Sequence, residues 1–254
     1  MEFREIELLV GNVPFISKKY GKFLYDFIIS KRLLNVLELG IAHGTATCYM
    51  AAALQELGEG SITSVDLIET KNAYVPSAEE QIEKAGLSAF VQIMRTQTGY
   101  TWFLHDAIRR NTQGLRCQEV YDLCIIDGPK NWTIDGAAFF FVDKLLKEGA
   151  WLIFDDYNWT YGAADNARQV TDGITHRLLS DEELHTPQIK EVFELLVKPH
   201  PNYSDFVLLD GGHWAMARKN ISDTKTYIER SEDSYRDVVA KMFHRAKRYL
   251  DRAS

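Results

Sequence analysis

The sequence has no long hydrophobic run. Its longest apolar stretch, residues 136–142, falls far short of the roughly 20 residues that a membrane-spanning helix needs. The first residues are acidic where a secretory signal peptide would be basic. We therefore expect a cytoplasmic protein that makes no membrane contact.

Basic charge and cysteine are also scarce. The chain has 29 Lys and Arg against 36 Asp and Glu, and its net charge of -7 would repel nucleic-acid phosphates, so we expect no nucleic-acid partner. Three cysteines are too few for a disulfide framework, and an odd number suits a reducing compartment. No internal repeat, low-complexity tract or flexible linker interrupts the chain. A single domain over residues 1–254 is the expected organisation.

Segments of strand and helix character alternate along most of the chain. Strands are predicted at residues 35–40, 61–66, 90–94, 121–127 and 150–155, and helices at residues 45–57, 78–85, 100–111, 133–146 and 163–179. This alternation is typical of a parallel sheet covered by helices on both faces. Two further strands, at 205–209 and 213–217, are separated only by Asp210, Gly211 and Gly212 and predict an antiparallel hairpin.

We therefore predict an α/β fold with a Rossmann-like, doubly wound, seven-stranded sheet that is mostly parallel and ends in a C-terminal antiparallel β-hairpin. The core is expected at residues 35–217, and residues 1–34 are expected to form a helical segment that caps the substrate site. Residues 218–254 predict an amphipathic C-terminal helix. Its apolar face is expected to pack on its own domain or on a twin subunit in a homodimer, with a membrane-surface or nucleic-acid contact as the less favoured alternative.

Carboxylates follow the predicted strands at one edge of the sheet. Glu38, Asp66, Asp127 and the pair Asp155 and Asp156 lie at the carboxyl ends of four strands, where ligands bind in open parallel sheets. Gathering carboxylates in this way costs desolvation energy unless a cation or a hydroxyl-rich ligand binds there. The sequence therefore predicts a ligand site at this edge.

The turn after the first strand lacks the G-x-G start of dinucleotide-binding folds. Its pattern, Glu38, Gly40 and Gly44 with Asp66 ending the second strand, resembles the first motif and acidic residue of class I S-adenosylmethionine-dependent methyltransferases. Small glycines let the backbone approach the methionyl part of such a cofactor, and a carboxylate can accept both ribose hydroxyls.

This resemblance implies S-adenosyl-L-methionine as the cofactor. The residues expected around it are Glu38, Gly40, His43, Gly44, Thr45, Asp66, Thr96, Gln97 and Asp127. Thr96 and Gln97 follow the third strand, where the family contacts the adenine. The residues alone leave two alternatives, a loop or capping carboxylate for Asp66 and a simple backbone hydrogen bond for His43.

The carboxylates of Asp127, Asp155 and Asp156 are predicted to converge if their two strands are neighbours. Three such groups within a few ångströms repel one another, so we predict that they hold Mg²⁺ or another divalent cation. The alternative is that Asp156 caps a turn while Asp155 pairs with an arginine such as Arg168.

The D-G-x-K and D-D-Y patterns after strands four and five resemble the metal-dependent O-methyltransferases, which include catechol-type and sugar-type members. In the catechol-type members a lysine three residues after the strand-four aspartate removes the hydroxyl proton, which implies a catalytic pair of Asp127 and Lys130. An exposed loop lysine is the alternative. Pro129 replaces the aspartate of sugar-type members, which puts an aspartate base in doubt. Asp156 replaces an asparagine of catechol-type members and makes the site more negative.

The expected function is therefore S-adenosylmethionine- and divalent-cation-dependent O-methylation of a small hydroxylated molecule, such as a natural product, a phenol or a sugar. Residues 12–20, 131–132 and 157–161 are expected to form the acceptor pocket, where their aromatic rings either stack on the acceptor or only pack. The alternatives are a metal-independent N- or C-methyltransferase, a nicotinamide oxidoreductase and a non-catalytic nucleotide-cofactor-binding protein.

Overall fold

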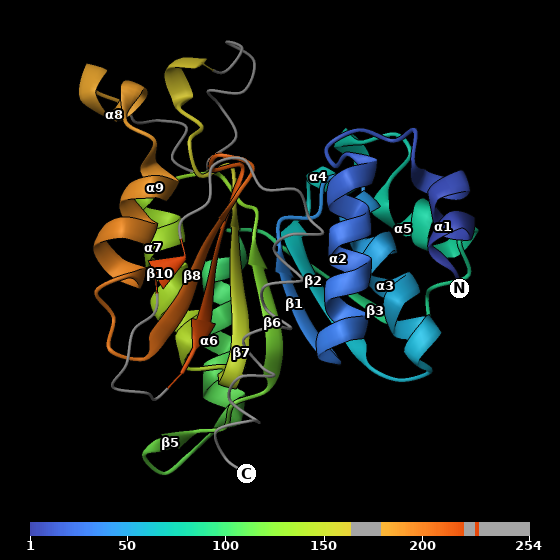
Figure 1. Ribbon diagram of the computed structural model, residues 1–254, viewed down its shortest axis with the longest axis horizontal. Helices are drawn as coiled ribbons and strands as arrows, with labels where there is room; N and C mark the ends of the chain where they lie inside the picture. The colour runs from blue at the N-terminus through green and yellow to red at the C-terminus, as the bar shows by residue number, and fades with distance from the viewer. Residues whose placement is uncertain (164–178, 221–226, 229–254) are drawn as a thin grey trace.

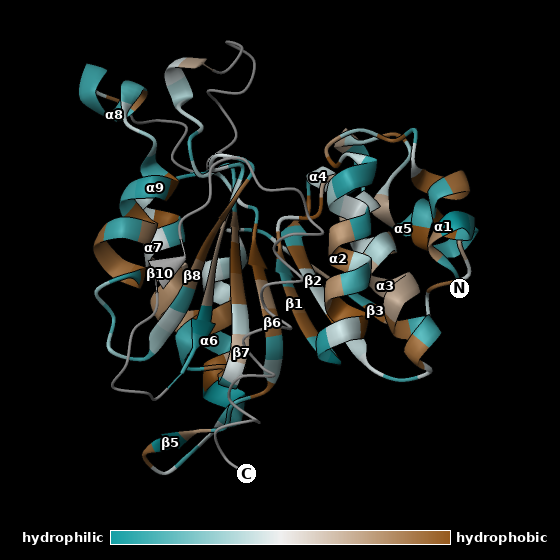
Figure 2. Cartoon of the chain, in the orientation of Figure 1, coloured by the Kyte–Doolittle hydropathy of each residue, from teal (hydrophilic) through white to brown (hydrophobic). Residues whose placement is uncertain are grey.

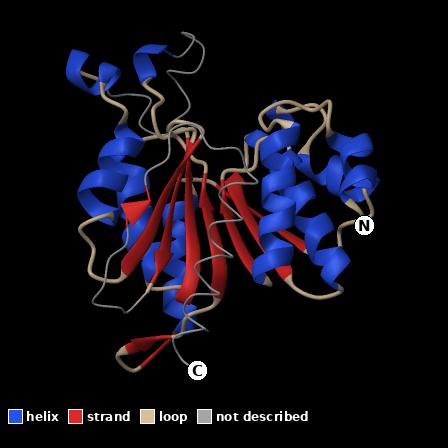
Figure 3. Ribbon diagram, viewed as in Figure 1, coloured by secondary structure: helices blue, strands red, loops and turns tan. Residues whose placement is uncertain are grey.

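A single sheet with helices on both faces forms the centre of the computed structural model, which describes residues 1–163, 179–220 and 227–228 (Figures 1 and 3). The strand order is β10-β8-β9-β7-β6-β1-β2-β3. The sheet contains β1 (Asn35–Leu39), β2 (Ser61–Leu67), β3 (Val91–Thr96), β6 (Tyr121–Ile126), β7 (Leu146–Asp155), β8 (Tyr203–Leu209), β9 (Trp214–Lys219) and β10 (Tyr227–Ile228). The predicted fold is confirmed: β3, β2, β1, β6 and β7 run parallel, and β9 pairs antiparallel with both β7 and β8. The short β10 is an eighth strand beyond the seven that were predicted.

Two helical layers cover the sheet. One contains α1 (Phe3–Val10), α2 (Lys18–Lys31), α3 (Thr45–Leu57) and α5 (Ala78–Lys84), and the other contains α6 (Tyr100–Asn111), α7 (Trp132–Asp143) and α9 (Gln188–Val192). Alternate residues of β1 serve the two layers, because Val36 packs with the first while Leu37 and Leu39 pack with the second. Figure 2 shows hydrophobic residues along the central strands, as expected of strands that are buried on both faces.

Several short elements complete the described chain. They are α4 (Thr70–Ala73), the β4 (Thr112–Gln113) and β5 (Arg116–Cys117) hairpin, η1 (Tyr161–Ala163), α8 (Asp181–His185) and the π-helical turn η3 (Phe193–Val197). The sequence reasoning missed the β4–β5 hairpin and the run from α8 to η3. None of the described helices has the length and apolar character needed to cross a bilayer.

The boundary between α7 and β7 differs from the prediction. The helix ends at Asp143 instead of residue 146, and β7 begins at Leu146 instead of residue 150. The apolar pattern continues through Leu145 and Leu146, which are both fully buried, so periodicity alone does not mark the change. The Leu145 carbonyl accepts hydrogen bonds from the amides of Val120 and Tyr121, which draws the chain out of the helix and alongside β6.

The expectation of a helix over the whole of residues 218–254 is wrong at its start. Arg218 and Lys219 lie in β9, where they pair with Ser204 and Tyr203 of β8, and β10 adds a short parallel strand beside β8. Backbone pairing with β8 extends β9 beyond the apolar residues from which the strand was predicted. The remainder of this segment and residues 164–178 of the predicted helix at 163–179 lie outside the described residues.

Candidate functional site

The glycine turn between β1 and α3 forms one wall of a cavity at the carboxyl edge of the sheet. Gly40 has φ +98°, and a Cβ atom there would lie 2.0 Å from the carbonyl oxygen of Asp127. Gly44 has φ +74°, and its Cβ would lie 2.7 Å from that of Ala78 on α5. Only glycine therefore lets this turn pack so closely on β6 and α5.

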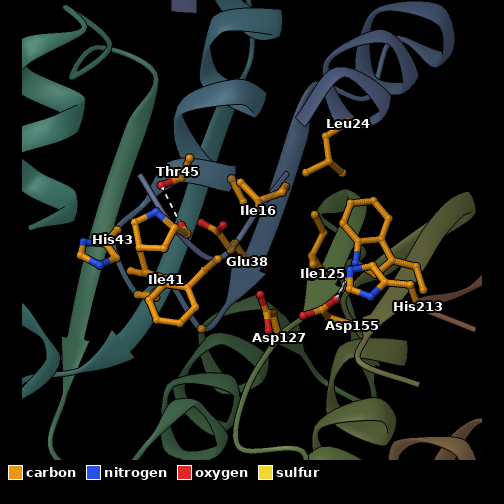
Figure 4. Close-up of a pocket in the computed structure, with 16 residues that line it drawn as sticks. Ile16, Leu24, Glu38, Ile41, His43, Thr45, Ile125, Asp127, Asp155 and His213 are labelled. Carbon is orange, nitrogen blue, oxygen red and sulfur yellow. Dashed lines mark hydrogen bonds and ion pairs between the residues drawn. The ribbon is translucent and has the colours of Figure 1, made fainter. Parts of the chain in front are cut away.

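Glu38 is buried beneath the turn, with 2% of its surface exposed. Its Oε2 atom accepts hydrogen bonds from the hydroxyls of Thr47 and Ser64, both at 2.6 Å. Burial raises the pKa of this carboxyl from 4.5 to about 7, although both hydroxyls act to lower it. The side chain lines the cavity between the glycine turn and Asp127 (Figure 4).

Asp66, at the end of β2, supports the glycine turn from behind. Its Oδ2 atom accepts hydrogen bonds from the amides of Ile41 at 2.9 Å and Ala42 at 3.1 Å, and its Oδ1 atom accepts one from the amide of Leu67 at 2.7 Å. The loop-carboxylate alternative therefore describes its contacts in this structure. The ribose contact stays a prediction.

Of the other residues expected around the cofactor, some line the cavity and others lie outside it. His43 lines the cavity, donates a hydrogen bond from Nδ1 to the carbonyl oxygen of Pro76 at 2.6 Å, and stacks on Phe15. Thr45 lies beside it at the start of α3 and is also part of the lining. By contrast, Thr96 donates to the carbonyl oxygen of Asp66 at 3.3 Å and, with Gln97, lies outside the cavity lining.

The cavity is an open cleft, and about 550 Å³ of empty space, open solvent included, lies between its walls. It runs from the N-terminal segment Pro14–Phe15–Ile16, past the glycine turn, to Asp127, Asp155 and His213 (Figure 4). The glycine turn and the buried acid along this cleft together fit a nucleoside cofactor with a methionyl group.

The three predicted acidic residues do converge, and their common partner is the ammonium group of Lys130. Its Nζ atom donates a hydrogen bond to Asp127 Oδ1 and lies 3.5 Å from Asp155 Oδ2 and 3.6 Å from Asp156 Oδ2. Only 10% of the Lys130 side chain is exposed. It is therefore not the solvated loop lysine of the alternative interpretation.

The charges in this cluster shift one another's pKa values. Burial acts to lower the pKa of Lys130, but Asp127, Asp155 and Asp156 outweigh it and raise this pKa, so the ammonium holds its proton here. Desolvation and the charge of Asp155 raise the pKa of Asp127, whereas Lys130 and a hydrogen bond from Asp127 lower that of Asp155 despite its burial. A lysine that acts as a catalytic base needs a lowered pKa, and the protein groups around Lys130 do not by themselves produce one.

His213 is a candidate ligand that the sequence reasoning missed. One donor atom each from Asp155, Asp156 and His213 lies within 4.8 Å of the other two. Carboxylate oxygens with an imidazole nitrogen are suitable ligands for a divalent cation, so the residues present fit such an ion. The signal lay in the predicted hairpin, since antiparallel pairing sets Trp214 opposite Asp155.

Asp135 of α7 holds the loop that carries Lys130, and it was also missed. It is fully buried, and its Oδ2 atom accepts a hydrogen bond from the amide of Asn131 at 2.7 Å while the Tyr100 hydroxyl donates to Oδ1. Burial raises the pKa of this carboxyl to about 6. An aspartate in the first turn of a mostly apolar helix was the available signal.

Aromatic residues surround the acidic cluster, but several of them are structural. Tyr157 and Tyr161 are buried, and their hydroxyls donate to Glu194 at 2.5 Å and to the carbonyl oxygen of Pro129 at 2.6 Å. Trp132 remains 39% exposed beside the Lys130 loop. Of the segments expected to bind the acceptor, residues 14–16 line the cavity.

Comparison with known proteins adds a family model and several solved structures. Residues 37–157 match a family model described as a methyltransferase domain, a range that includes the glycine turn and the acidic cluster. No protein in the curated set matches the sequence.

The structural neighbours include an O-methyltransferase from Bacillus cereus in complex with SAH, with a TM-score of 0.58, 20% identity and coverage of 87% of this chain and 92% of that one. An O-methyltransferase from Streptomyces achromogenes involved in tomaymycin synthesis, in complex with SAM, has a TM-score of 0.57 and 15% identity over 87% and 91% of the two chains. An SAH-bound methyltransferase from Podospora anserina has a TM-score of 0.57 and 14% identity over 85% and 86%. At these identities the likeness concerns the fold.

Proposed function

We propose that this chain is an S-adenosylmethionine-dependent methyltransferase that methylates a hydroxyl of a small molecule with the help of a divalent cation. The match of residues 37–157 to a methyltransferase-domain family model and the likeness of the fold to methyltransferases support the first part. The observation that carries the proposal is the convergence of Asp127, Asp155 and Asp156 around Lys130, since Asp127 and Asp155 also line the cavity that the glycine turn and Glu38 line.

In this proposal the residues of the turn bind the methyl donor. The backbone of Gly40 and Gly44 allows the donor to lie close to β1, and Glu38 faces its amino acid portion. His43 and Phe15, stacked with ring centroids 5.5 Å apart, close the cavity on the N-terminal side. Asp66 accepts three amide hydrogen bonds, only one of them at Oδ1, so its carboxylate keeps acceptor capacity for a ribose hydroxyl.

The acidic cluster prepares the acceptor. A divalent cation held by the aspartates would bind the acceptor oxygen and stabilise its negative charge. A phenol with a pKa of about 10 requires roughly 4 kcal/mol for deprotonation at pH 7, and an aliphatic hydroxyl requires far more. Lys130 lies among the same carboxylates. A cation bound to these carboxylates would lower the pKa of the Lys130 ammonium, which would then release its own proton to solvent and, as a neutral amine, take up the proton of the acceptor hydroxyl.

Methyl transfer assays with chelator test this function. The purified chain is incubated with labelled S-adenosylmethionine and a panel of catechols, simple phenols, sugars and amines, with EDTA and then with Mg²⁺ or Mn²⁺ added back. We expect label on an oxygen of a hydroxylated acceptor, loss of transfer with EDTA and recovery with the added ion. Label transfer that is indifferent to EDTA contradicts the cation requirement.

One observation favours a second candidate, a metal-independent N- or C-methyltransferase. Lys130 already places a positive charge among the three carboxylates, so the cluster has a neutralising partner without any metal ion. In that enzyme the aspartates would orient an amine or an activated carbon. Transfer of label to the amines of the panel in the presence of EDTA would support it.

A further inference from the structure

The imidazole of His213 stands beside the two consecutive aspartates at the end of β7. Its Nε2 atom lies 3.8 Å from Asp155 Oδ1, and 43% of its side chain is exposed where it lines the cavity. Asp127 instead bonds to Lys130 and does not belong to the group of mutually close donor atoms formed by Asp155, Asp156 and His213. The protein therefore offers two oxygen donors and one nitrogen donor at this point.

The fold holds the His213 ring in place. The ring stacks on Tyr20 with centroids 4.3 Å apart and an interplanar angle of 27°. The Tyr20 hydroxyl in turn donates to Asp210 Oδ2 at 2.7 Å, which ties α2 to the turn between β8 and β9. A ring that is already held by stacking loses less freedom on binding an ion, and this favours ligation.

Asp155 is oriented in a similar way. The indole Nε1 of Trp214 donates to Asp155 Oδ1 at 2.6 Å, and the two residues are direct partners in the antiparallel pairing of β7 and β9. Hydrogen bonds of this kind fix the direction of a metal-binding carboxylate. The hairpin of β8 and β9 thus carries both His213 and Trp214, whose indole orients Asp155.

We propose that His213 is a third protein ligand, with Asp155 and Asp156, for the divalent ion of this methyltransferase, and that it gives the site a preference for Mn²⁺ or Co²⁺ over Mg²⁺. Magnesium prefers oxygen donors only, whereas an imidazole nitrogen stabilises transition-metal ions increasingly along the series from Mn²⁺ to Cu²⁺. The proposal rests on the cation-dependent function and specifies its metal.

Calorimetry with the metal ions alone tests the ligation without relying on catalysis. Mg²⁺, Mn²⁺ and Co²⁺ are titrated into the full chain and into His213→Phe, which keeps an aromatic ring against Tyr20 but removes the nitrogen, and His213→Ala. We expect the wild type to bind Co²⁺ more tightly than Mg²⁺, and both variants to lose about tenfold or more in Co²⁺ affinity with little change for Mg²⁺. The visible absorption of bound Co²⁺ should also change in both variants.

The matched control is His105→Ala, because His105 lies on α6 away from the cavity and is 49% exposed. Its Co²⁺ affinity and spectrum should equal those of the wild type. If His213→Phe folds and binds Co²⁺ with unchanged affinity and spectrum, His213 is not a ligand, and chelator-sensitive methyl transfer would still leave the proposed function standing. If the wild type binds none of the three ions and transfers methyl groups with EDTA present, both proposals fail.

Discussion

At the residue scale, the carboxyl group of Glu38 links the cavity to the pH dependence of stability. The folded protein holds this proton up to about pH 7, while the unfolded chain releases it near pH 4.5. The stabilisation that the neutral group provides is therefore complete below pH 4.5 and is lost as the pH rises through 7.

We predict that Glu38→Gln removes this loss. The amide oxygen can still accept from Thr47 and Ser64, which both donate to one oxygen of Glu38. Relative to the wild type, the variant should gain on the order of 2 to 3 kcal/mol in unfolding free energy between pH 4.5 and pH 8. Urea unfolding of the ligand-free protein at a series of pH values in this range measures the difference in unfolding free energy. The control is Glu83→Gln, because Glu83 is exposed. Equal pH dependence in all three proteins would contradict the assignment.

Lys130 balances the charge of the acidic cluster, so its removal should expose the repulsion among the acids. We predict that Lys130→Met lowers the unfolding free energy by about 1 to 3 kcal/mol, a range reduced because the carboxylates keep partial contact with water. Added Mn²⁺ should restore this loss, and kcat should fall by roughly 10² to 10⁴. Thermal unfolding and initial rates measure the two effects.

A control for this variant is Lys147→Met, which breaks the ion pair of Lys147 with Asp122 at 2.8 Å far from the cavity. It should change neither kcat nor the effect of Mn²⁺ on stability. If Lys130→Met keeps its kcat, the lysine is not the proton acceptor.

At the element scale, the glycine turn depends on a close approach that no side chain allows. The Cβ of Gly40→Ala would meet the backbone of Asp127 at 2.0 Å, and backbone cannot rotate away as a side chain can. Gly58→Ala is the matched control, since Gly58 also has a positive φ, +74°, but its Cβ would meet nothing within 4 Å.

We predict that Gly58→Ala costs about 1 kcal/mol, the penalty for its backbone conformation alone. Gly40→Ala should cost several kcal/mol more, of the order seen for overpacked cores, and should abolish binding of S-adenosylhomocysteine. Urea unfolding and calorimetry separate the two variants. Equal losses of stability in both would show that the contact with Asp127 is not what requires glycine.

The same elements show how far sequence reasoning reaches. The alanine-rich helix at Thr45–Leu57 was predicted with its observed bounds, where Gly44 and Gly58 cap its two ends, and the helix at Tyr100–Asn111 was likewise found in full. The strand-end acids were found because parallel topology brings strand ends together. His213 was not, because its place beside Asp155 depends on the register of a hairpin that begins about fifty residues later in the chain.

At the scale of the whole molecule, the cavity joins parts that are far apart in sequence. Its wall includes Pro14 from the N-terminal segment, Glu38 of β1, Asp127 after β6 and Trp214 of β9. Lys19 and Tyr20 of α2 both contact Asp210 in the turn between β8 and β9, so α2 and this hairpin are tied together beside the same site. A ligand in the cavity would therefore contact segments that are far apart in the sequence, so its binding should stabilise the whole domain.

The last prediction uses this coupling to identify the cofactor class. S-adenosylhomocysteine at a hundred times its dissociation constant should stabilise the fold by about 2.7 kcal/mol. For a chain of this length that corresponds to a rise in Tm of roughly 5 to 10 °C. NAD⁺ should give none, because the turn at Gly40 and Gly44 lacks the glycine spacing of a pyrophosphate loop. Thermal unfolding with each ligand decides, and a larger shift with NAD⁺ would favour an oxidoreductase and overturn the assignment of the donor.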